Sequence, residues 1–125
     1  MILLDTNYLI RALVDQTMES RRITEWMSEG EELITTAACW YEFLCGPVDN
    51  EGILVVSALI EDRIVPLTRD QAQEASRLYT ETGRKRNLRV DAMIAAAAMV
   101  SNATLATENR KDFERFEEFG LQLVD

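Results

Sequence analysis

The sequence predicts an α/β fold, a single domain in which helices flank both faces of a central parallel five-stranded sheet. Short apolar runs alternate with helical patterns along the chain, and this alternation is typical of parallel strands joined by crossover helices. At 125 residues and 47% hydrophobic composition, the chain is long enough to close one core and too short for two. We therefore predict one domain over residues 1–125.

Five short apolar segments are the predicted strands. The first leads directly into Asp5, a residue suited to capping a following helix. The third contains Pro66, which has no backbone N–H, so we expect it near a sheet edge or at the end of its strand. The predicted strands cover residues 2–4, 32–35, 64–67, 104–106 and 122–124.

Apolar spacing and punctuating residues predict the helices between these strands. Gly30, Gly46-Pro47 and Gly83 are expected to stop three of them. The segment rich in alanine before Ser101 is so apolar that it must be largely buried. The predicted helices cover residues 18–28, 37–45, 53–60, a segment capped by Thr68 or Asp70 and running through Thr82, and residues 90–100, with 81–89 as a surface loop.

Composition restricts the chemistry. The chain has no histidine, which excludes Ser-His-Asp and Cys-His catalysis and zinc sites that need imidazole. Cys39 and Cys45 would point about 240° apart on one helix, so we expect no disulfide between them. The net charge of −9 opposes a broad nucleic-acid-binding surface, although metal ions at an acidic site reverse the charge locally.

Four polar residues stand where an α/β sheet usually carries its site, near the carboxyl ends of strands and the starts of helices. Asp5 directly follows the first predicted strand, and Asn109 follows the fourth by a few residues. Asp91 begins the alanine-rich helix, where the helix dipole favours an anion. Glu42 interrupts the apolar run 39–45, and a carboxylate there must reach water, be paired or bind a metal.

Each of these positions also has a purely structural interpretation. An aspartate between a strand and a helix is a good N-cap, so Asp5 and Asp91 are candidate caps as well as candidate ligands. Asn109 is a candidate for local loop hydrogen bonds. Thr6 fits the capping turn beside Asp5, although its hydroxyl could also support a metal ligand from behind.

Four motifs follow one another along the chain: Leu3-Leu4-Asp5-Thr6-Asn7, Tyr41-Glu42-Phe43, Val90-Asp91-Ala92-Met93-Ile94-Ala95-Ala96, and Leu105-Ala106-Thr107-Glu108-Asn109-Arg110-Lys111-Asp112-Phe113. Together they resemble the PIN domain family, especially the VapC-type toxins of toxin–antitoxin pairs. The resemblance runs the full length of the chain, in the right order and with suitable spacings. It implies a PIN-like domain with a central parallel sheet.

The resemblance also implies an activity, that of an Mg²⁺- or Mn²⁺-dependent endoribonuclease that cleaves RNA phosphodiester bonds. Asp5 and Asp91 would be the principal metal ligands, Glu42 a ligand or water-orienting base, and Asn109 a neutral outer contact. In the family the fourth position is often Asp and often Asn, and Asp112, one helical turn beyond, is a candidate substitute. Mg²⁺ prefers oxygen ligands and keeps several waters, so two or three carboxylates suffice to hold it.

Partners follow from the same resemblance: an RNA substrate, a cognate small antitoxin protein whose tail crosses the active site, and a second copy of the chain in a homodimer. Thr6 and the basic residues just ahead of Asp91 are candidates to contact the RNA, the basic residues through its phosphates. A solvated charged loop is the alternative interpretation of this basic cluster, which consists of Arg84, Lys85, Arg86 and Arg89.

Two other functions stay open at this point. A PIN fold can be a catalytically inert binding module, or a nuclease that processes RNA outside any toxin–antitoxin pair. A phospho-receiver domain shares the βα rhythm but needs an aspartate after the third strand, where this chain has Thr68-Arg69. The apolar stretches fall short of the roughly 20 residues that span a bilayer, and the N-terminus has no basic stretch before an apolar run. We therefore expect a cytoplasmic protein without membrane association.

Overall fold

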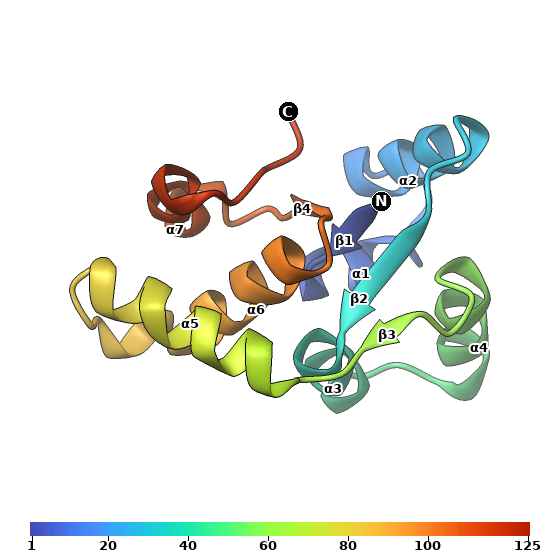
Figure 1. The fold of residues 1–125 in the computed structure, drawn as a ribbon. Coiled ribbons are helices and arrows are strands. Elements are labelled where there is room, and N and C mark those ends of the chain that lie inside the picture. Colours follow the sequence, from blue (N-terminus) through green and yellow to red (C-terminus); the bar gives the residue numbers. More distant parts are fainter.

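Parallel strands form the centre of the computed structural model, which describes residues 1–125. β1 (Ile2–Leu4) lies between β2 (Leu33–Thr36) and β4 (Thr104–Ala106), and β3 (Ile64–Val65) pairs with the other side of β2. Every pairing is parallel, and the strand order is β3-β2-β1-β4 (Figure 1). The predicted fold class is therefore confirmed.

The sheet has four strands, not the five that were predicted. Residues 122–124 form only one parallel bridge to the sheet, between Leu105 and Leu123. The carbonyls of Val124 and Asp125 instead accept hydrogen bonds from the side chains of Arg110 and Arg22, which ends the ladder after that bridge.

The third predicted strand is shorter than expected. β3 stops at Val65 because Pro66 has no N–H with which to continue the ladder, and β3 is an edge strand as predicted.

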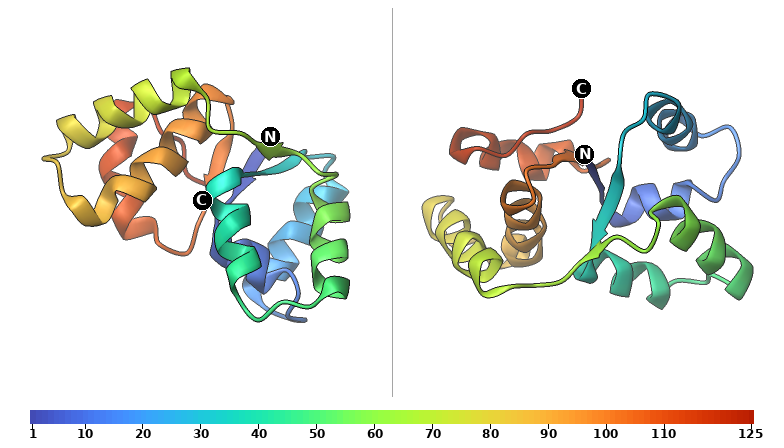
Figure 2. Two further views of the ribbon diagram at one scale, coloured as in Figure 1. Left: turned by 90° about the horizontal axis from the view of Figure 1, so that it is seen from below. Right: turned by 45° about the vertical axis from the view of Figure 1, so that its right-hand side comes forward.

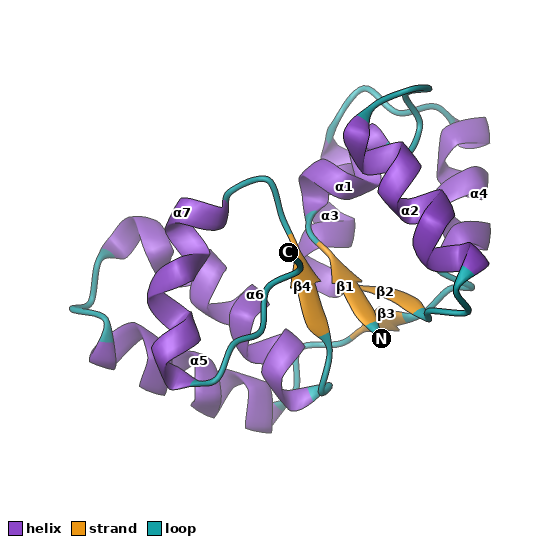
Figure 3. Cartoon of the chain, turned by 90° about the horizontal axis from the view of Figure 1, so that it is seen from above, coloured by secondary structure: helices purple, strands orange, loops and turns teal.

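Helices cover both sides of the sheet. α1 to α4 lie on one side and α5 to α7 on the other, as the right-hand view of Figure 2 and the view from above in Figure 3 show. None of these helices is long and apolar enough to cross a membrane. Their bounds are α1 (Thr6–Arg11), α2 (Met18–Ser28), α3 (Ala37–Cys45), α4 (Asn50–Leu59), α5 (Arg69–Glu81), α6 (Arg89–Val100) and α7 (Arg110–Phe113), with 3-10 helices η1 (Arg86–Leu88) and η2 (Glu114–Phe119).

Threonine side chains cap three of the helices, α2, α3 and α5. Thr36 Oγ1 accepts a hydrogen bond from the N–H of Cys39, at 2.9 Å, and so starts α3 directly after β2. Thr68 Oγ1 accepts from the N–H of Gln71, at 3.2 Å, so Thr68 rather than Asp70 caps α5. The predicted surface loop 81–89 contains η1, a short helical turn that leads into α6.

The core lies between the sheet and these helices. All three residues of β1 are buried, as expected for the inner strand of a parallel sheet covered on both faces. The alanines of α6 are all buried, and α5 packs along this helix. Small side chains permit this close approach, and it fixes the position of the first turn of α6, where Asp91 lies.

Candidate active site

Asp5, Glu42, Asp91 and Asn109 all line one open cleft of about 710 Å³. They come from the end of β1, the middle of α3, the first turn of α6 and the start of α7. β1 and β4 are neighbours in the sheet, so Asp5 and the segment after β4 leave it side by side. Residues more than 100 positions apart in the chain therefore meet at one edge.

Asp5 is buried, with 5% of its surface exposed, and its carboxylate accepts three hydrogen bonds. Oδ1 accepts from the Thr6 N–H at 2.8 Å and from Cys39 Sγ at 3.5 Å, and Oδ2 accepts from Thr107 Oγ1 at 2.7 Å. Burial raises the pKa of Asp5 above its usual value, while these bonds lower it in part and the charge of Glu42 raises it further. Asp5 is also the N-cap of α1.

Glu42 lies on α3 and is exposed at the cleft. Its Oε2 accepts a hydrogen bond from Thr6 Oγ1 at 2.9 Å. The carboxylate in the apolar run therefore reaches water and is held by a hydroxyl group. Thr6 itself lines the cleft and links the start of α1 to α3.

Asp91 lies in the first turn of α6 but does not cap it. The N-cap position belongs to Leu88, which has no capping side chain, so the interpretation of Asp91 as a cap is wrong. Burial, and after it the negative charges of Asp112, Asp5 and Glu42, together raise the pKa of Asp91 to about 6, against a smaller lowering by Arg115. Asp91 thus stands among like charges with little compensation.

Asn109 lines the cleft at the start of α7 and makes no capping bond with its side chain. Its backbone N–H donates to Thr107 Oγ1 at 3.0 Å, so the main chain of Asn109, and not its side-chain amide, makes the hydrogen bond to Thr107. Asp112 does not line the cleft, but its charge acts on Asp91.

Several residues around the cleft were not singled out from the sequence. Thr107 and Cys39 touch Asp5 from behind, and neither lines the cleft itself. Burial raises the pKa of the Cys39 thiol to about 12, which keeps it protonated. Asn7 and Glu108 line the cleft, and Asn7 Oδ1 accepts from the Glu108 N–H at 3.3 Å. All four lie in or beside the quoted motifs, but spacing alone does not indicate their contacts.

The basic cluster lies outside the cleft. Arg84, Lys85, Arg86 and Arg89 are all exposed, on the connection between α5 and α6 and the first residue of α6. None of them lines the cleft.

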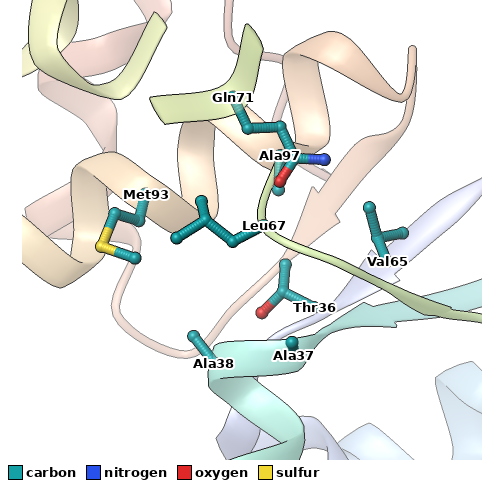
Figure 4. A pocket seen from close by; sticks show the side chains of 8 residues that line it. All are labelled: Thr36, Ala37, Ala38, Val65, Leu67, Gln71, Met93 and Ala97. Atoms are coloured by element: carbon teal, nitrogen blue, oxygen red, sulfur yellow. The ribbon is translucent and has the colours of Figure 1, made fainter. Parts of the chain in front are cut away.

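A second, much smaller cavity adjoins the cleft (Figure 4). It holds about 20 Å³, room for about one water molecule, and shares Ala38 and Met93 with the cleft. Thr36 and Gln71 are its only polar lining residues, so nothing in it resembles a catalytic group.

The cleft has the donor groups that a hard divalent cation needs. Four of its lining residues are acids, namely Asp5, Glu42, Asp91 and Glu108, and no lysine or arginine lines it. The exposed phenol of Tyr41 is the other ionisable group in the lining. No group of three or more His, Cys, Asp or Glu side chains is arranged so that it could hold a metal ion by itself. Mg²⁺ commonly takes one or two carboxylates and fills its other positions with water, and this donor set fits that pattern.

Comparison with known proteins identifies the family of this chain. The chain matches the PIN domain family over residues 2–118. It is 31% identical over 128 aligned positions to Ribonuclease VapC1 of Methanocaldococcus jannaschii, covering 99% of this chain and 87% of that protein.

Two solved structures share the fold. The crystal structure of FitAcB from Neisseria gonorrhoeae has a TM-score of 0.73 at 23% identity, covering 100% of this chain and 97% of that one. A toxin–antitoxin complex from Klebsiella pneumoniae has a TM-score of 0.67 at 24% identity, with 90% of each chain covered. From the family match and the sequence identity to Ribonuclease VapC1, the chain belongs to the PIN domain family.

Proposed function

We propose that this protein is a divalent-metal-dependent endoribonuclease and the toxin of a toxin–antitoxin pair. The observation that carries the proposal is the cleft in which Asp5, Glu42 and Asp91 converge without any basic lining residue. A relative named as a ribonuclease and a neighbour of the same fold solved as a toxin–antitoxin complex support it.

Asp5 and Asp91 are the residues that would hold Mg²⁺ or Mn²⁺, with Glu42 as a further ligand or as a base, and Asn109 as a neutral outer contact. When bound, the cation supplies Lewis acidity at the phosphodiester and lowers the pKa of water beside it. Glu42, held by Thr6, is suited to orienting that water or accepting its proton. The chain has no histidine and no lysine lines the cleft, so its carboxylates are the groups best suited to accept this proton near neutral pH.

The RNA and protein partners are part of the same proposal. Thr6 lies beside the acids at the cleft, and we assign it to the support of the RNA-binding site. The basic cluster would contact RNA phosphates outside the cleft. A small antitoxin would silence the enzyme, and two copies of the chain would form a homodimer.

Cleavage of a mixed single-stranded RNA pool tests the activity, with Mg²⁺, with Mn²⁺ and with EDTA. We expect cleavage with either metal, none with EDTA, and loss of at least 100-fold in rate for Asp5→Asn with an unchanged circular dichroism spectrum. Asp15→Asn is the matched control, since Asp15 is an exposed acid outside the cleft. Full activity in Asp5→Asn would contradict the assignment, and no cleavage under any condition would favour an inert binding module.

A further inference from the structure

Thr107 is a buried residue after β4, and its hydroxyl has two partners at the acidic cleft. Oγ1 donates its proton to Asp5 Oδ2 at 2.7 Å and accepts from the Asn109 N–H at 3.0 Å. A hydroxyl group has one proton and two lone pairs, so these two bonds fix its orientation from both sides. Thr107 is 7% exposed and does not line the cleft, so it acts there only through Asp5 and Asn109.

The hydrogen bonds are divided unevenly between the two oxygens of Asp5. Oδ1 accepts from both Thr6 and Cys39, whereas Oδ2 accepts only from Thr107. Each carboxylate oxygen has about two acceptor positions, so those of Oδ1 are filled and one on Oδ2 is open. Oδ2 is therefore the oxygen of Asp5 that is available to a cation.

We infer that Thr107 is a positioning residue, which fixes Oδ2 of Asp5 as the oxygen that binds a divalent cation and ties this carboxylate to the turn at Asn109. The inference rests on the proposed function, and it adds the ligating atom and the residue that orients it. Hydrogen bonds to metal ligands from behind set the orientation of those ligands, and their removal typically costs about 10- to 100-fold in metal affinity.

Two substitutions test the contributions of the hydroxyl and the methyl group of Thr107 separately. Thr107→Val keeps the shape and loses the hydroxyl, and Thr107→Ser keeps the hydroxyl and loses the methyl. The measurement is Mn²⁺ binding to the RNA-free protein by isothermal titration calorimetry. We expect the Kd to rise about tenfold or more in Thr107→Val and to stay within about threefold of wild type in Thr107→Ser.

Thr35→Val is the matched control. Thr35 is a fully buried threonine whose hydroxyl donates to the carbonyl of Leu4 at 2.8 Å, and it does not line the cleft. The same substitution there removes a buried hydrogen bond without touching Asp5, so we expect an unchanged Kd. A purely structural role for Thr107 predicts instead that the Kd follows the urea-unfolding free energy across all three variants.

The outcomes distinguish this inference from the proposed function. Wild-type affinity in Thr107→Val, together with lost binding in Asp5→Asn, overturns the role of Thr107 and leaves the metal site in place. Equal loss in Thr107→Val and Thr107→Ser also overturns it, because the hydroxyl would then not be responsible. Binding that is absent in the wild type, or unchanged in Asp5→Asn, overturns both. If Thr107→Val does not fold, Thr107→Ala carries the same expectation.

Discussion

Asp5 combines two roles that the sequence presents as alternatives. Its Oδ1 caps α1 through the Thr6 N–H, while the carboxylate as a whole lines the acidic cleft. A carboxylate has two oxygens, so capping with one leaves the other for the cleft. Asp91, in contrast, has no capping role, and its position among like charges has no structural benefit of its own.

The pKa of Asp91, raised from its usual 3.8 to about 6, makes stability depend on pH. Between these values the folded protein keeps a proton that the unfolded chain has lost, so stability falls as the pH rises from about 4 to about 6. We expect Asp91→Asn to stabilise the metal-free protein at about pH 7.5 by on the order of 1 kcal/mol, because solvent screens part of the repulsion.

Urea unfolding across this pH range checks the prediction. Near pH 3.5 the carboxyl group is largely neutral in both states, and the substitution should have little effect. An equal stabilisation at both pH values would show that the titration of Asp91 is not its cause.

At the scale of elements, α3 and α6 deliver carboxylates to the cleft by different means. Thr36 starts α3 at the end of β2, which places Glu42 two turns further on. The buried alanines of α6 fix Asp91 by close packing. Three residues of the exposed basic cluster lie on the connection from α5 to α6, and the fourth, Arg89, is the first residue of α6, two positions before Asp91.

We predict that Arg86→Glu raises the RNA concentration needed for half-maximal rate several-fold and leaves the rate at saturating RNA unchanged. Removing a phosphate contact weakens RNA binding, and the effect should shrink as salt increases. Arg21→Glu on α2 is the matched control, since Arg21 is also exposed and lies outside the cleft and the basic cluster. Equal effects of the two substitutions would assign the change to net charge alone.

The whole molecule has a net charge of −9, and its acidic cleft contains no basic lining residue. Both features favour a small cation over a bare polyanion at this site, because a bound divalent ion reverses the local charge that repels RNA. An active nuclease needs this cation and an inert binding module does not, so cation binding distinguishes the two functions.

We expect Mg²⁺ or Mn²⁺ to raise the melting temperature. At ten times the Kd the stabilisation is about 1.4 kcal/mol by mass action, which corresponds to roughly 5 °C for a domain of this size. Differential scanning calorimetry of wild type and Asp5→Asn/Asp91→Asn measures it. The double variant should show little metal-dependent shift, and a shift as large as that of the wild type would place the cation elsewhere.

Local sequence patterns predicted the bounds of helices and strands well where these bounds depend on residues within the same segment. α2, α3, β1 and β4 have the predicted bounds, and α4, α5 and α6 differ by a few residues from the predicted helices. The short helix α7 was not predicted. The fifth strand is reduced to one bridge, and the carbonyl of its last residue, Val124, bonds to the side chain of Arg110, which no local pattern relates to residues 122–124. Cys39 and Cys45 are both free, as their helical spacing predicted.

The sequence by itself determined the fold class and most of the elements, because periodicity and punctuation act within short segments. Its motifs also identified four of the residues that line the cleft, namely Asp5, Glu42, Asp91 and Asn109, but not Asn7 or Glu108. Only the tertiary structure decided which groups touch them. Thr107 and Asp5 are 102 positions apart, and Thr6 and Glu42 are 36 apart. Such hydrogen bonds exist only after parallel strands bring their carboxyl ends to one edge, and no spacing along the chain encodes that meeting.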